Sequence, residues 1–156
     1  TTGGVSVGEE DHVKAALAHI GHLDLWKIAI KPGKPLAFGS IGSTPFLGLP
    51  GNPQSVFVTF KVLARVFLAY KQGQRQGVLP KPVPVACDFE LTKAQNRREY
   101  LRVQLVSTGE GLRLQKHANQ SSGVLSSAVW ADGFAIIEAH QTIENGESVG
   151  FISINT

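Results

Sequence analysis

The chain has 156 residues, of which 42% are hydrophobic, enough for one large domain or two small ones with cores of their own. Fifteen Lys and Arg against twelve Asp and Glu give a formal net charge of +3, and the basic residues form no single block, so the composition does not indicate a nucleic-acid-binding protein. No apolar run is long enough to span a membrane and the first residues lack the features of an export signal, so we expect no membrane insertion and a cytoplasmic location.

A glycine-rich loop with hydroxyl and acidic side chains opens the chain. Such a loop normally follows a strand and precedes a helix in an α/β unit, where its N–H groups can hold phosphate. From spacing alone, backbone geometry explains the glycines slightly better, and a favourable charge in a helix's first turn explains Asp11 better than Mg²⁺ binding does. Because no strand precedes the loop and methionine is absent, we expect the chain to be a piece of a longer protein.

The next segment predicts one helix and then short strands. Over residues 9–20 the apolar side chains recur with the spacing of one buried helical face, and Gly21 ends this helix. The apolar positions are Val13, Ala16, Leu17 and Ile20. Strands are expected over residues 23–30, 36–38 and 46–49.

Three lysines accompany the first of these strands. Lys27 and Lys31 lie four residues apart, so on an extended strand they point to the same face, and Lys34 follows after a Pro-Gly turn. A solvated strand face is the common alternative. The apolar run 28–30 is instead typical of a covered parallel strand, whose carboxyl end is where open α/β sheets bind ligands. The pattern therefore favours a polyanionic ligand.

A long helix is predicted from Pro53 to about Tyr70. Asn52 has the position of an N-cap and Pro53 that of the first helical residue, which leaves N–H groups suited to an oxyanion. The buried stripe of this helix is expected to contain Val56, Phe60, Leu63 and Phe67.

The composition changes after Lys71, where glycines and polar residues are followed by alternating prolines. We therefore expect two domains, residues 1–75 and 76–156. The second part alternates in short apolar segments, which is typical of a small β-barrel or sandwich. Its strands are expected over residues 83–89, 100–106, 112–115, 134–138 and 149–154. Prolines at positions 80, 82 and 84 would confine the first of them to an edge.

Polar residues of the second part suit an anion. Arg97, Arg98 and Arg102 flank Tyr100, and the planar guanidinium group matches oxyanions. Segment 119–128 adds four serines, which are usually only turn formers unless the arginine strand lies beside them. The histidines show no zinc spacing, and the single cysteine, Cys87, is expected to be buried and reduced.

Three motifs stand in the order GGVSVGEED, WKIAIKPGKPLAFG and GLPGNPQS, and REYLRVQL and a Q-S-S-G turn follow them. With these motifs the chain resembles, over nearly its whole length, the C-terminal half of molybdopterin molybdenumtransferase, a family that includes the E domain of gephyrin. The resemblance implies an α/β plus all-β fold: an incomplete α/β/α molybdopterin-binding domain followed by a small β-barrel domain. It implies that adenylylated molybdopterin and molybdate are converted, with Mg²⁺, to molybdenum cofactor and AMP, and that the full-length protein is a homodimer.

The same resemblance assigns site residues. Asp11 would bind the metal or help cleave the adenylate's pyrophosphate link, and Lys27 and Lys31 would also be catalytic. The residues that would bind molybdate and substrate are Ser6, Lys31, Lys34, Pro35, Ser55, Arg102 and Ser122. Molybdate is a dianion of roughly phosphate size, so cationic and N–H donors suit it. The dithiolene sulfurs of the pterin, not protein thiols, would receive the metal.

Other functions fit parts of the pattern. A non-catalytic, gephyrin-like scaffold would offer a groove to a peptide partner, and the sequence does not exclude it. A nucleic-acid surface on the arginine strand is disfavoured because stacking aromatics are few there. A molybdopterin adenylyltransferase would share the α/β fold but should lack the barrel.

Overall fold

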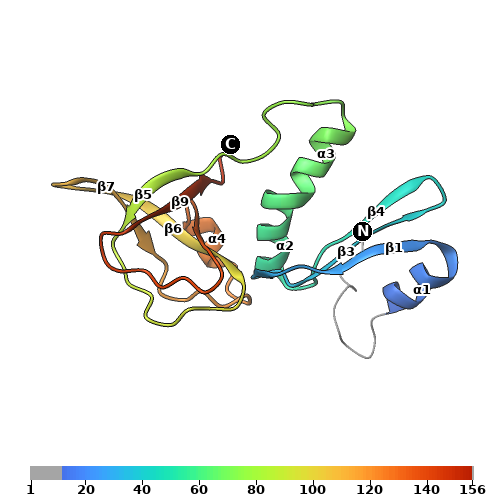
Figure 1. The fold of residues 1–156 in the computed structure, drawn as a ribbon, viewed down its shortest axis with the longest axis horizontal. Coiled ribbons are helices and arrows are strands. Elements are labelled where there is room, and N and C mark those ends of the chain that lie inside the picture. Colours follow the sequence, from blue (N-terminus) through green and yellow to red (C-terminus); the bar gives the residue numbers. More distant parts are fainter. Residues whose placement is uncertain (1–11, 156) are drawn as a thin grey trace. The chain divides into compact units, whose positions relative to one another are not determined.

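The computed structural model describes residues 12–155, and the chain divides into two compact units, Thr1–Gln76 and Gly77–Thr156 (Figure 1). The described elements of the first unit are α1 (His12–Ile20), β1 (His22–Lys27), β2 (Ile30–Lys31), β3 (Pro35–Ile41), β4 (Thr44–Gly48), α2 (Pro53–Thr59), the π-helical turn η1 (Phe60–Ala64) and α3 (Arg65–Lys71). Those of the second are β5 (Val83–Cys87), β6 (Arg98–Thr108), β7 (Gly111–Lys116), α4 (Ser126–Trp130), β8 (Gly133–Ile137) and β9 (Ser148–Ser153).

The sheet of the first unit is antiparallel, with the strand order β1-β3-β4. The expectation of a covered parallel strand over residues 23–30 is therefore wrong. Its apolar run is the place where the chain leaves β1: Ala29 is exposed, and the N–H of Ile28 bonds to the carbonyl of Lys34 at 3.0 Å. Ile28 and Ala29 form the connection to the two-residue strand β2, which begins at Ile30.

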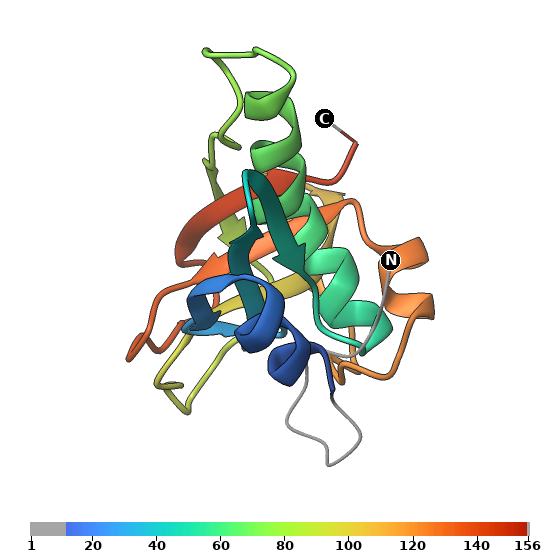
Figure 2. The same ribbon diagram turned by 90° about the vertical axis from the view of Figure 1, so that its right-hand side faces the viewer.

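Helix α1 lies against β1 and buries little of its predicted face (Figure 2). Leu17 is buried, but Ala16 and Ile20 are exposed, so the predicted stripe is only partly correct. Lys14 holds the helix to the strand instead, with its ammonium 5.0 Å from the ring centre of Trp26.

The predicted long helix is confirmed as one continuous rod from α2 through η1 to α3 (Figure 1). Its predicted buried stripe is only partly correct: Val56 and Phe67 are half-buried, but Phe60 and Leu63 are each nearly 40% exposed. The buried residues are Gln54, Ser55, Val58, Thr59, Val62 and Ala64. These are mostly small side chains, which let the helix approach the loop before β3 closely, as the contacts of Gly33 below show. Farther along, Phe67 packs edge-on against Phe38 of β3, with ring centres 5.7 Å apart.

The second unit is a closed five-stranded barrel, and all five predicted strands are present. Strand β6 pairs with β7, β7 with β5, β5 with β9, β9 with β8, and β8 again with β6. All these pairs are antiparallel except β5 with β7. Closure leaves these five strands without a free edge strand.

The prediction that prolines confine the strand after residue 80 to an edge is wrong. Strand β5 has a partner on both sides: it pairs with β9 from Val83 to Ala86 and with β7 at Ala86 and Cys87. Pro84 lies opposite Gly150 of β9, before the pairing with β7 begins. The missing N–H groups therefore fall where only one neighbour is paired.

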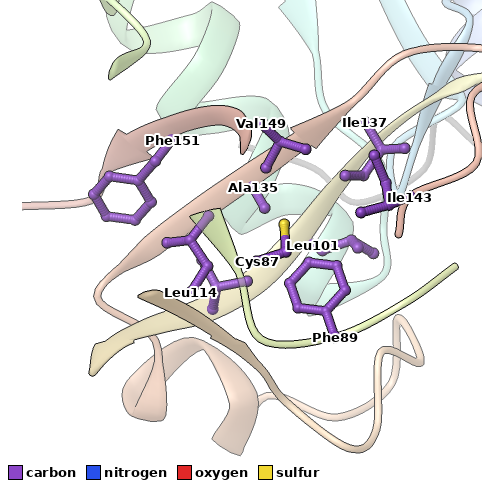
Figure 3. Packing of buried hydrophobic residues seen from close by; sticks show 10 residues of the cluster. Cys87, Phe89, Leu101, Leu114, Ala135, Ile137, Ile143, Val149 and Phe151 are labelled. Carbon is purple, nitrogen blue, oxygen red and sulfur yellow. The ribbon is translucent and has the colours of Figure 1, made fainter. Parts of the chain in front are cut away.

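Ten buried side chains form the barrel core, and Figure 3 shows most of them pointing toward a common centre beside the sulfur of Cys87. They are Cys87, Phe89, Leu101, Val103, Leu114, Ala135, Ile137, Ile143, Val149 and Phe151. The expectation of a buried thiol is confirmed, since Cys87 is fully buried and unbridged. Burial, and next the charge of Glu147, raises the pKa of this thiol to about 11, which keeps it protonated and unreactive.

Candidate functional site

The loop between β1 and β3 carries the three predicted lysines. Lys27 ends β1 opposite Pro35, the first residue of β3, and the N–H of Ile28 closes the loop onto Lys34. Lys27 and Lys34 are exposed, and Lys31 is half-buried. Lys27 and Lys34 thus expose their side chains at the two ends of this connection, and Lys31 between them is less exposed.

Gly33 fixes this loop against helix α2. It is buried with a φ of 115°, and a Cβ built on it would lie 2.5 Å from Cγ2 of Thr59. Only glycine combines this backbone conformation with so close an approach. The Pro-Gly turn of the lysine motif therefore packs on the helix that follows the third motif, and the two sequence motifs meet in the fold.

Ser55 and Thr59 lie on the side of α2 that is buried. The hydroxyl of Thr59 donates to the carbonyl oxygen of Ser55 at 2.7 Å and contacts that of Val56 at 3.2 Å. Asn52 occupies the N-cap position with extended backbone, but its side chain makes no capping hydrogen bond, and Pro53 stands in the first turn. Ser55 itself is only 6% exposed, so this residue, which was predicted to bind substrate, is buried within the first unit.

The two units differ in charge. Residues 1–76 contain eight lysines and arginines and four acidic residues, whereas residues 77–156 contain seven basic and eight acidic residues. The excess of positive charge in the chain therefore belongs to the unit with the lysine loop. A surface of this sign attracts anions.

Arg102 is the most buried charged residue of the barrel, at 1% exposure. Its Nε donates to Oγ of Ser127 at 3.1 Å, and its Nη2 donates to the carbonyl oxygens of Ser121 at 3.2 Å and Asn119 at 3.5 Å. Within the described residues no carboxylate pairs with it, and burial lowers the pKa of its guanidinium group. The charge lies directly behind the Q-S-S-G turn, and contact of this group with molybdate stays a prediction.

Ser122, the other predicted barrel residue, lies in that turn and is half-buried. Its neighbours use their polar groups locally: the N–H of Ser121 bonds to Oδ1 of Asn119 at 2.9 Å, and that of Val124 to the carbonyl of Ser121 at 3.3 Å. Among residues 12–155, Ser122 makes no hydrogen bond to another residue through its hydroxyl or its N–H. Within this part of the chain its donors are therefore unused.

Sequence reasoning missed two residues of this region. From the sequence alone, Ser127 was expected to be a turn former unless the arginine strand lay beside it. In the structure Arg102 of that strand binds the hydroxyl of Ser127, so the condition is met. Gln120 belongs to the Q-S-S-G turn and had no predicted role, yet its side chain bonds to the backbone of Arg102. Both residues lie in the polar segment 119–128, which the sequence does single out. Their partner Arg102, however, lies eighteen or more residues away in the chain.

Arg97 and Arg98 do not join Arg102. Arg98 is exposed and its Nε lies 2.9 Å from Oε2 of Glu138, a hydrogen bond that raises the pKa of Arg98. Arg97 precedes β6 and is half-buried. An exposed ion pair of this kind contributes little to stability.

Ser6 and Asp11 lie outside the described residues. From residue 12 to residue 76 the one acidic side chain is Asp24, whose Oδ1 lies 3.1 Å from Nε2 of His22. In the described part of the chain, no three His, Cys, Asp or Glu side chains form a group that could hold a metal ion. Mg²⁺ binding stays a prediction tied to Asp11. No helix within residues 12–155 has both the length and the apolar character needed to cross a membrane.

Comparison with known proteins places both units. Residues 1–70 match the family described as "Probable molybdopterin binding domain", and residues 84–154 match the "MoeA C-terminal region (domain IV)". A molybdopterin molybdenumtransferase of Haemophilus influenzae is 40% identical over 96% of this chain and 37% of its own length. The chain belongs to the molybdopterin molybdenumtransferase family. The expected α/β plus all-β fold is confirmed.

Two further relatives have names that refer to the same biosynthetic pathway. The molybdenum cofactor synthesis protein cinnamon of Drosophila melanogaster is 36% identical over 84% of this chain and 22% of its own length. The crystal structure of a molybdopterin biosynthesis MoeA protein from Pyrococcus horikosii matches with a TM-score of 0.72 and 30% identity, over 90% of this chain and 34% of that one. The chain spans well under half the length of each of these relatives.

Proposed function

We propose that this chain is part of an enzyme of molybdenum cofactor biosynthesis, which inserts molybdate into adenylylated molybdopterin and releases AMP. The names of the relatives support the biosynthetic role. The observation that carries the proposal is the buried guanidinium of Arg102, whose charge no described carboxylate balances, behind a turn in which Ser122 has unused donors. A buried cation without a counter-charge costs stability, and an anion bound at the turn offsets that cost.

The charge of the first unit supports the same chemistry. Molybdate is a dianion and the adenylylated pterin carries a pyrophosphate link, so both substrates need cationic partners. Lys27 and Lys34 are exposed on the loop before β3, and Lys31 is half-buried in it. A partly buried ammonium group acts in a lower dielectric than a solvated one, so its attraction for an anion is stronger.

Each predicted residue has a role in this proposal. Lys27 and Lys31 neutralise the negative charge that collects on phosphate and metal-oxo groups as the pyrophosphate link breaks. Lys34, Pro35 and Ser55 bind the substrates from the first unit, and Arg102 and Ser122 do so from the barrel. Ser6 adds a hydroxyl, and Asp11 binds Mg²⁺ or assists cleavage, as the family resemblance implies. The homodimer of the full-length protein is part of the same proposal.

The experiment uses the full-length protein, with molybdate-dependent release of AMP as the assay. Lys31→Ala is expected to lower the rate at least about 100-fold, the usual loss when one charge-stabilising donor is removed. Lys71→Ala is the matched control, since Lys71 is an exposed lysine at the end of α3. It should keep the rate within about twofold. Thermal unfolding and circular dichroism check that both variants fold.

Asp11→Ala in the same protein tests the second catalytic assignment, and we expect an equal loss of AMP release. Normal turnover in both the Lys31 and Asp11 variants would refute the site. Absence of any molybdate-dependent turnover in the unsubstituted protein, together with a stoichiometric peptide or protein partner, would instead favour the gephyrin-like scaffold.

A further inference from the structure

We propose that Gln120 is a positioning residue: its carboxamide fixes the turn 119–123 onto β6, so that the unused donors of Ser122 are held in place for an oxyanion. This inference rests on the proposed function and deepens it, because it names the group that prepares the barrel side of the molybdate site.

Gln120 binds the backbone of Arg102 through both ends of its carboxamide. Its Oε1 accepts the N–H of Arg102 at 3.0 Å, and its Nε2 donates to the carbonyl oxygen of Arg102 at 2.9 Å. The same Nε2 also donates to the carbonyl oxygen of His117 at 3.1 Å. Three hydrogen bonds thus converge on one side chain.

These bonds take the place of a strand partner. The pairing of β6 with β7 ends at Val103 opposite Lys116, and the next residue, His117, donates its N–H to the carbonyl of Arg102 at 3.1 Å. In an antiparallel ladder, a hydrogen-bonded residue exchanges both its N–H and its C=O with one partner. At Arg102 the carboxamide of Gln120 supplies both groups, so the turn cannot slide along β6 without breaking both bonds to Arg102.

A second anchor acts on the residues either side of Gln120. The guanidinium of Arg102 binds the carbonyl oxygens of Asn119 and Ser121, while its own backbone is held by Gln120. Residues 119–121 are therefore fixed by one residue of β6 from two directions. Ser122 is the next residue, and the first in the turn whose polar groups remain unused among the described residues.

Apolar packing along this segment is uneven. Ala128 and Ala131 are buried and Val124 is half-buried, whereas Leu125 is 52% exposed and Val129 on α4 is 88% exposed. Directional bonds add to this packing, including Nε2 of Gln104 to the carbonyl of Trp130 at 2.7 Å. Directional bonds fix atoms to a fraction of an ångström, as oxyanion recognition needs.

Hydrogen exchange measured by NMR on this 156-residue chain tests the positioning directly. Because Oε1 of Gln120 accepts the N–H of Arg102, Gln120→Ala should speed exchange of that amide at least about 10-fold, the value of one lost hydrogen bond. The amide of Val103, which lies opposite Gly133 of β8, should change less. Gln115→Ala is the matched control, because Gln115 is an exposed glutamine on β7.

Gln120→Met serves as a second variant, since it keeps the length and bulk of the side chain without either hydrogen-bonding group. It should reproduce the faster exchange even if the alanine variant folds poorly. Molybdate titration by calorimetry on the full-length protein then measures the consequence. We expect both Gln120 variants to raise the Kd for molybdate about 10-fold with the Kd for molybdopterin unchanged, and Gln115→Ala to change neither.

The two measurements separate the two ideas. Unchanged exchange at Arg102, or an unchanged molybdate Kd in both Gln120 variants, overturns the positioning role. An equal rise in the Kd values for molybdate and molybdopterin also overturns it, because that result reports general loosening of the barrel. If the unsubstituted protein does not bind molybdate, the proposed function is wrong and the oxyanion half of this inference falls with it, whatever the exchange arm shows.

Discussion

Replacement of Gly33 tests whether the lysine loop depends on its close packing against α2. The residue is buried with a φ of 115°, and a Cβ would lie 2.5 Å from Cγ2 of Thr59 and 3.3 Å from Cδ1 of Ile30. The left-handed backbone costs an alanine about 1–3 kcal/mol, and the overlap with Thr59 adds about 1–3 kcal/mol of overpacking. We expect Gly33→Ala to lower the free energy of unfolding of the first unit by about 2–6 kcal/mol.

Two comparisons separate the contact from the backbone. Gly42 also has positive φ, 57°, but a Cβ added there would have no neighbour within 4 Å, so Gly42→Ala should cost only about 1–2 kcal/mol. Thr59→Ser removes Cγ2 but keeps the hydroxyl that bonds to the carbonyl of Ser55. Combined with Gly33→Ala, it should recover about 1–2 kcal/mol as a coupling energy.

Urea denaturation of the whole chain is the assay, followed by the fluorescence of Trp26 in the first unit. All variants carry Trp130→Phe, so that the barrel tryptophan does not contribute. The reasoning is refuted if Gly33→Ala and Gly42→Ala lose the same free energy, or if Thr59→Ser shows no coupling to Gly33→Ala. Either result would mean that the loop is not held by this contact.

Two predictions concern the barrel. Burial raises the pKa of Cys87 to about 11, so this thiol should react with a thiol reagent at pH 8 only after unfolding. Because the folded-state pKa lies above the ordinary 9.0, the protonated thiol contributes about 2–3 kcal/mol to the free energy of unfolding. This contribution is complete below pH 9 and is lost between pH 9 and 11. Urea titrations across this range should show the loss in the native chain and not in Cys87→Ala. Leu114→Ala should cost about 2–5 kcal/mol in thermal unfolding, while Leu112→Ala, at a position 58% exposed, should stay within about 0.5 kcal/mol.

The barrel strands could be predicted from the sequence because their signals are local. Alternation of apolar residues and turn residues at their ends depends only on neighbours in the chain, and all five strands are present where the pattern predicts them. The alternation of apolar residues does not show which strands pair with one another. This explains the wrong prediction that β5 is an edge strand. Pro84 excludes a backbone hydrogen bond on one side of β5, and only the register shows that β5 has no partner on that side at this position.

In the first unit, the predictions failed where tertiary packing decides. Phe60 and Leu63 have the spacing of a buried stripe, yet the helix buries Ser55 and Thr59 instead. A close approach to Gly33 selects small residues, and hydrophobicity alone ranks large ones higher. The same preference for large apolar residues led to the prediction of one strand over residues 23–30, where Ile28 and Ala29 instead separate β1 from β2.

The site predictions divide in the same way. Arginine and lysine are recognisable as anion partners by type, so Lys31 and Arg102 could be named from the sequence. Their environments could not be, because the groups around Arg102 come from residues 17 to 25 positions away. Gln120 carries no charge and no motif chemistry of its own, and its role exists only once the turn lies on β6.

Strand β6 shows why a charged residue persists in so stable a part of the fold. Its side chains alternate, so Leu101 and Val103 enter the core while Arg102 and Gln104 face outward to the segment 117–131. An apolar residue in place of Arg102 would pack without a desolvation cost. It would also remove the guanidinium bonds to the carbonyls of Asn119 and Ser121, and would leave the turn with a single anchor on β6, at Gln120. The strand thus bears the cost of a buried cation at the one position where that cation fixes the turn and supplies positive charge behind Ser122.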